Sequence, residues 1–241
     1  MAVMTTTARV EAVALDATDI DGLAAFYAEL TGWPVRSRSP EWISIETPGG
    51  PDLAFQRVAE HLAPEWPGQE RPQQVHLDIQ VDGHQAAADR AIGLGAKRLA
   101  DGPNWITLAD PAGHPFDLCQ SDEAGSGMRL FAATFDAPDA SALARFYADL
   151  TGMEVTYDGP EGALVAGEGR SVMFQQVAEF TAPRWPDPAH PQQGHLDLDV
   201  DDLDVGERRA LELGATRLPG GGESFRVFAD PAGHPFCLTI G

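Results

Sequence analysis

The chain has 241 residues, 43% of them hydrophobic, and this length suits two domains of about 120 residues, each with an ordinary core. It carries 37 acidic against 16 basic residues, and the formal charge of −21 argues against a nucleic-acid partner, whose phosphates would be repelled. Its only two cysteines, Cys119 and Cys237, indicate no disulfide framework and favour a reducing cytoplasm.

The first ten residues lack a charged start followed by an apolar core, so no signal peptide is expected. No run approaches the roughly 18 apolar residues of a membrane span. We therefore expect a cytoplasmic protein without a membrane partner.

The first half of the chain predicts two successive βαβββ units. In the first unit, Leu23, Phe26, Tyr27 and Leu30 fall on one face of a helix that ends at Gly32. Apolar runs on either side predict strands at 10–15, 42–46 and 53–58. The second unit follows with a strand at 75–81, a helix at 86–94 and strands at 97–99, 105–109 and 115–119.

The second half of the chain repeats the first. The octapeptide Ala-Asp-Pro-Ala-Gly-His-Pro-Phe occurs at 109–116 and again at 229–236, and each copy predicts a tight turn between two strands. Phe26-Tyr27 and His76-Leu77-Asp78 also return, as Phe146-Tyr147 and His195-Leu196-Asp197. We interpret the chain as a tandem duplication with domains at 1–120 and 128–241 and a linker at 121–127.

Each copy also contains a proline-rich loop with a central tryptophan. Trp66 lies in the first loop, which ends in Pro72-Gln73-Gln74, and Trp185 lies in the second, which ends in Pro191-Gln192-Gln193. Long loops are often functional. Each tryptophan has two roles open to it, stacking on a planar ligand or anchoring its own loop.

The paired βαβββ units, the Phe-Tyr helix, the His-Leu-Asp strand and the closing Asp-Pro-x-Gly hairpin resemble the vicinal oxygen chelate superfamily, in particular its glyoxalase-like and bleomycin-resistance-like members. The resemblance implies an α+β fold of two tandem domains, each with paired βαβββ units that form a curved mixed sheet around a cup. The superfamily contains both metal-dependent enzymes and proteins that bind a drug without turnover, so the fold does not decide the function.

The resemblance also implies where a metal would be held. The positions that correspond to the family's metal ligands fall at Ala12, Gln56, His76 and Asp117 in the first copy, and at Ala132, Gln175, His195 and Cys237 in the second. Alanine offers no donor atom. The first copy offers His76 and Asp117, with Gln56 as a weak third ligand, and a catalytic divalent ion needs at least three. We therefore expect no cofactor.

The sequence leaves three functions open. The first is a small-molecule binding protein of the bleomycin-resistance type, which sequesters a drug or natural product, aromatic or cationic, without metal chemistry. The second is a metal-dependent lyase, isomerase or dioxygenase that uses His76 and Asp117, and the third is an interaction module with filled cups. A monomer and a homodimer both fit. The candidate ligand-binding residues are Gln56, Trp66, His76, Asp78, Asp117, Gln175, Trp185, His195, Asp197 and Cys237.

Overall fold

The computed structural model describes residues 8–125, 127–187 and 189–241, and it shows four α-helices and sixteen strands in that part of the chain. The segment on which the absence of a signal peptide was argued lies largely outside these residues, as does residue 126 of the expected linker. None of the helices in the described part is long and apolar enough to cross a membrane.

The first copy consists of two βαβββ units, and the sequence predicts each of their elements except the strand at 35–38. Their elements are β1 (Arg9–Ala17), α1 (Ile20–Thr31), β2 (Val35–Arg38), β3 (Trp42–Ile45) and β4 (Asp52–Arg57), then β5 (Val75–Val81), α2 (His84–Gly93), β6 (Lys97–Asp101), β7 (Trp105–Ala109) and β8 (Pro115–Gln120). A short 3-10 helix, Asp122–Ala124, leads into the second copy.

The second copy repeats this order. Its elements are β9 (Met128–Ala137), α3 (Ala140–Thr151), β10 (Glu154–Gly159), β11 (Gly162–Gly167) and β12 (Arg170–Gln176), then β13 (Gly194–Asp199), α4 (Leu203–Glu212), β14 (Thr216–Gly221), β15 (Phe225–Ala229) and β16 (Pro235–Thr239). The run of three glycines at 220–222, which suggests a loop, is in part the end of β14.

The first helix of each copy begins and ends where the local sequence dictates. Asp19 caps α1, since its side chain accepts a hydrogen bond from the backbone N–H of Gly22. Gly32 ends the helix in the left-handed conformation, at φ 78°, which glycine adopts without a steric penalty. Asp139 and Gly152 do the same for α3.

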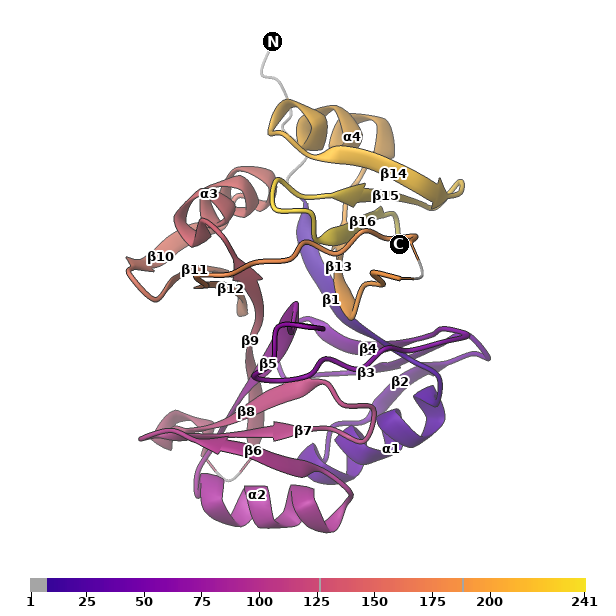
Figure 1. Ribbon diagram of the computed structural model, residues 1–241. Coiled ribbons are helices and arrows are strands. Elements are labelled where there is room, and N and C mark those ends of the chain that lie inside the picture. Colours follow the sequence, from indigo (N-terminus) through magenta and orange to yellow (C-terminus); the bar gives the residue numbers. More distant parts are fainter. Residues whose placement is uncertain (1–7, 126, 188) are drawn as a thin grey trace.

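The strands form two eight-stranded mixed sheets, each of which runs through both copies (Figure 1). One sheet has the order β14-β15-β16-β13-β1-β4-β3-β2, and the other has the order β10-β11-β12-β9-β5-β8-β7-β6. The seams are antiparallel. β1 pairs with β13, with Ala14 opposite His195, and β5 pairs with β9, with His76 opposite Thr134.

The α+β class and the two mixed sheets of paired βαβββ units are confirmed, but each unit has a different partner from the expected one. The first unit of copy one shares its sheet with the second unit of copy two, and the two middle units share the other sheet. The sequence period predicts strands and their faces but carries no information on which strand edge pairs with which. Each cup therefore takes residues from both copies.

The two units of one copy remain in contact through buried aromatic side chains. Tyr27 of α1 stacks on Phe55 of its own unit and meets Phe116 of the next unit edge-on. Its hydroxyl also donates a 3.0 Å hydrogen bond to Asp110 Oδ2. In Figure 1, α1 and α2 lie at one end of the molecule and α3 and α4 at the other. Helices thus hold each copy together, whereas the sheets join the copies.

Candidate metal and ligand sites in two cups

Two clusters of polar side chains lie on the central strands, one in each sheet. Cup A, at β1, β4, β13 and β16, is defined by Gln56, Trp185, His195, Asp197 and Cys237. Cup B, at β5, β8, β9 and β12, is defined by His76, Asp78, Asp117, Thr134 and Asp136. In each cup one histidine, one aspartate and one further donor have ligand atoms within 4.8 Å of one another.

Cup B holds three donors on two neighbouring parallel strands. His76 Nε2 lies 3.7 Å from Asp78 Oδ1, and Asp78 is in register with Asp117 on β8. The other oxygen of Asp78 accepts a hydrogen bond from the Thr134 hydroxyl of the second copy. Asp117 Oδ1 is buried and has no hydrogen-bond partner among the described residues. A buried, unpaired carboxylate oxygen is costly, so this atom is suited to a cation or a ligand donor.

The carboxylates of cup B are held in an environment that disfavours a bare negative charge. Burial raises the pKa of Asp117, against the opposing effect of His76. Burial also raises the pKa of Asp136, although Gln73 donates a 3.0 Å hydrogen bond to it. For the Cys119 thiol, burial and the neighbouring Asp78 raise the pKa well above its ordinary value, so it stays protonated. A bound cation would stabilise the ionised forms of these buried carboxylates.

Cup A has a softer donor set and an open recess. His195 Nε2 lies 3.5 Å from Asp197 Oδ1, and Cys237 on β16 is in register with Asp197. The recess has a volume of about 200 Å³, and Gln56 of the first copy lines it together with Trp185, His195 and Cys237. Thiolate, imidazole and carboxylate together favour Zn²⁺ over harder ions.

The histidine and the thiol of cup A influence each other. Burial disfavours a charged His195, but hydrogen bonds to Asp197 and Cys237 outweigh it and raise its pKa well above the ordinary value. Burial raises the pKa of Cys237, while the hydrogen bond from His195 lowers it. Cys237 therefore has one neighbour that lowers its pKa, whereas the charged neighbours of Cys119 are both carboxylates, which raise it.

Comparison with known families agrees with this architecture. A model of the glyoxalase-like domain matches residues 12–119 and, a second time, residues 132–239. The chain belongs to this glyoxalase-like family. The resemblance to the vicinal oxygen chelate superfamily is thereby confirmed.

Solved structures share the fold of both glyoxalase-like copies. A mutant of glyoxalase I from Zea mays is 17% identical with a TM-score of 0.69, and the match covers 98% of this chain and 94% of that one. A putative dioxygenase from Bacillus subtilis is 12% identical with a TM-score of 0.66, covering 98% and 86%. At these identities the likeness concerns the fold alone. No curated protein sequence matches the chain.

The predicted site residues of the glyoxalase-like copies are brought together across the copies. Gln56 meets His195 and Cys237 in cup A instead of His76 and Asp117 of its own copy, because β4 is joined through β1 to β13. Gln175 is in register with Asp136 of cup B. Ala12 and Ala132 are opposite Asp197 and Asp78, so the small side chains leave room beside both carboxylates.

The expectation of no cofactor is corrected by the donor geometry. That expectation assumed that one ligand lies on the first strand of each copy, where the sequence has alanine. In the structure, Asp78 and Asp197 supply the third donor in their cups, since each shares a strand face with the histidine two residues before it. Three protein ligands are the number that a catalytic metal site needs.

Sequence reasoning missed two glutamines, each of which connects the histidine of one cup to an aspartate of the other copy. Gln73 and Gln192 contact His76 and His195, and each also binds an aspartate of the other copy. The available signal was the repeated Pro-Gln-Gln before each His-Leu-Asp strand.

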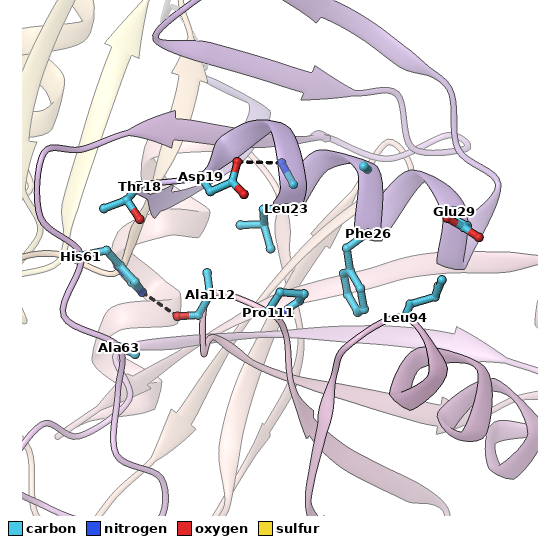
Figure 2. Close-up of a pocket in the computed structure, with 12 residues that line it drawn as sticks. Thr18, Asp19, Leu23, Phe26, Glu29, His61, Ala63, Leu94, Pro111 and Ala112 are labelled. Atoms are coloured by element: carbon cyan, nitrogen blue, oxygen red, sulfur yellow. Dashed lines mark hydrogen bonds between the residues drawn. The ribbon is translucent and has the colours of Figure 1, made fainter.

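Trp66 occupies a different place from Trp185. It lines a separate surface recess of about 320 Å³ with Lys97 and Leu99. Another recess, of about 540 Å³, also lies outside the cups, between α1, the first proline-rich loop and the hairpin at Pro111 and Ala112 (Figure 2). There, His61 Nε2 is 3.1 Å from the carbonyl oxygen of Ala112.

Proposed function

We propose that the protein is a metal-dependent enzyme of the vicinal oxygen chelate superfamily, a lyase, isomerase or dioxygenase that acts on a small molecule, with one divalent ion in cup B. The observation that carries the proposal is the convergence of His76, Asp78 and Asp117, with Asp117 Oδ1 buried and unpaired. One imidazole and two carboxylates fit Mn²⁺, Fe²⁺ or Zn²⁺. When bound, such an ion would polarise a substrate oxygen or activate a water molecule.

The protein's own residues prepare this site. Thr134 holds Asp78 through its hydroxyl, so this carboxylate keeps one oxygen turned toward His76. The Cys119 thiol lies 3.8 Å from the same oxygen and donates to it. The high pKa of this thiol keeps it a neutral donor at physiological pH.

Titration with Mn²⁺, followed by calorimetry, tests the proposal because Mn²⁺ prefers carboxylate over thiolate. We expect one ion per wild-type chain, and Asp117→Asn to weaken binding by at least about tenfold. The matched variant Cys237→Asp gives cup A the donor types of cup B and should add a second ion. A wild-type chain that binds no divalent ion, or an Asp117→Asn variant that binds it unchanged, contradicts the proposal.

A second candidate function is small-molecule binding in cup A, and the recess beside Trp185 favours it. This recess is lined by an indole, by Phe225 and by two glutamines, a mixture typical of ligand pockets. We expect an aromatic ligand to quench the fluorescence of Trp185, and Trp185→Phe to abolish that change while Trp66→Phe preserves it. Quenching that survives Trp185→Phe would place the ligand elsewhere.

A further inference from the structure

A chain of hydrogen bonds connects the histidine of cup B to an aspartate of the second copy. Gln73 Nε2 lies 3.0 Å from Asp136 Oδ1 and 3.2 Å from His76 Nδ1. Asp136 is only 8% exposed and His76 only 7%. Water therefore has little access, and the hydrogen positions in this chain are set by the protein groups themselves.

Cup A repeats this arrangement with the roles of the copies exchanged. Gln192 Nε2 is 3.2 Å from Asp16 Oδ1 and 3.2 Å from His195 Nδ1. Two separately diverged copies have thus kept the same three residue types in the same contacts. In cup A, however, Cys237 stands where cup B has Asp117. Cup A is therefore a matched control for cup B.

The aspartate determines the orientation of the glutamine amide. An ionised carboxylate only accepts hydrogen bonds, so Gln73 must turn its NH₂ group toward Asp136. The other hydrogen of that group then points at His76 Nδ1, which has to be the acceptor nitrogen. The ring hydrogen consequently sits on Nε2, on the side of Asp78.

This hydrogen position opposes metal binding by His76. A nitrogen that coordinates an ion carries no hydrogen, and a ligating histidine usually donates its other N–H to an outer acceptor. If the Gln73 amide turned over, its oxygen would accept from Nδ1 and Nε2 would be free. The same oxygen would then face the carboxylate of Asp136, which disfavours this orientation while the carboxylate is ionised.

We propose that Gln73 is a positioning residue of cup B. Asp136 of the second copy anchors the side-chain amide of Gln73, and the orientation of this amide decides which nitrogen of His76 carries the hydrogen. It thereby decides how readily Nε2 takes a divalent ion. Only the part that concerns the ion rests on the proposed function, because the tautomer of His76 belongs to the protein itself.

Imidazole ¹⁵N NMR of the histidine-labelled protein tests the tautomer. In the wild type we expect the hydrogen of His76 on Nε2. Asp136→Asn is nearly isosteric, but its amide can donate to the Gln73 oxygen, so His76 should shift toward the Nδ1–H tautomer. Asp16→Asn makes the same change in cup A and should leave His76 unaltered. A wild-type His76 with its hydrogen on Nδ1, or an unaltered tautomer in Asp136→Asn, overturns the proposal.

Mn²⁺ titration of the same variants tests the consequence. Asp136→Asn should bind Mn²⁺ about tenfold more tightly than the wild type, and Asp16→Asn should bind it equally. Tighter binding also distinguishes this effect from simple damage to the fold, which would weaken it. Weaker binding by a folded Asp136→Asn overturns the proposal. If the tautomer shifts but no variant binds an ion, the positioning role stands and the proposed function fails.

Gln73→Met provides a second route if Asp136→Asn does not fold. Methionine fills the same volume without an amide, so His76 loses its fixed partner and should populate both tautomers. A single Nε2–H tautomer that persists in Gln73→Met would show that Asp78 sets the hydrogen position without Gln73, and the proposal would be wrong.

Discussion

In each copy of the repeated octapeptide, the carboxylate of its aspartate is buried and organises the turn through hydrogen bonds. Asp110 Oδ1 accepts hydrogen bonds from the backbone N–H groups of Ala112, Gly113 and His114. Its Oδ2 accepts from the Tyr27 hydroxyl and lies 3.0 Å from His114 Nδ1. The motif and the Phe-Tyr helix, which recur together in the sequence, are thus parts of one network. His114 and its counterpart His234 are buried partners of an aspartate in this network.

His61, beside this network, should make the stability of the first copy dependent on pH. Burial and the neighbouring His114 lower the pKa of His61 to about 4, whereas the unfolded chain protonates it near 6.5. Between these values the unfolded state binds a proton that the folded state does not, so the free energy of unfolding falls as the pH falls from about 6.5 to 4. With allowance for its partial exposure, the loss is about 1 to 2 kcal/mol.

The second copy supplies the matched variant for this prediction, since Phe180 occupies the place of His61 and packs on His234. We expect chemical denaturation to show that the free energy of unfolding of His61→Phe, minus that of the wild type, is larger at pH 5 than at pH 7.5. An equal stability difference at both pH values would show that His61 does not titrate in this way.

At the scale of elements, local signals in the sequence predicted the helices and most strands. The apolar stripe of α1 and the stop at Gly32 are both local, so they were found without knowledge of the fold. The strand β2 was missed because all four of its residues are exposed and it has no apolar period. Which strands pair across the copies was also not predictable, because pairing depends on surfaces far apart in the chain.

The seam between β1 and β13 shows which detail decides such pairing. A side chain on Gly194 would place its Cβ 2.6 Å from the carbonyl oxygen of Ala14 and 3.2 Å from Val75. The corresponding residue of the first copy is Val75 itself, so at this junction one copy supplies a side chain and the other leaves space. Glycine in a strand sequence indicates a close approach, but the partner is visible only in three dimensions.

The candidate sites, like the fold, were predictable only in part. The histidines, aspartates and Cys237 were identified from the repeat and the family resemblance. Their grouping into cups was wrong, since Gln56 was assigned to the cup of its own copy. Gln73 and Gln192 were overlooked because the repeated Pro-Gln-Gln marks their position but does not indicate what their side chains contact. Their function follows only from the aspartates that the other copy brings to them.

At the scale of the whole molecule, the copies are held together by more than the linker. Gln74 and Gln193 form a reciprocal clasp, in which each side-chain oxygen accepts from the backbone N–H of the other, at 2.8 and 2.9 Å. The two seams, one within each sheet, add long antiparallel ladders between the copies. Cutting the chain between the copies therefore removes a covalent connection but none of these contacts.

We accordingly expect a protease site inserted at Glu123, which is exposed, to yield two fragments that stay together after cleavage. Light scattering should give the mass of the intact chain, and Mn²⁺ binding should persist, because Thr134 of the second fragment still holds Asp78 of cup B. The first fragment expressed alone would expose the edges of β1 and β5 and should pair with a second copy of itself or aggregate. Fragments that separate and remain monomeric and folded would contradict the shared sheets.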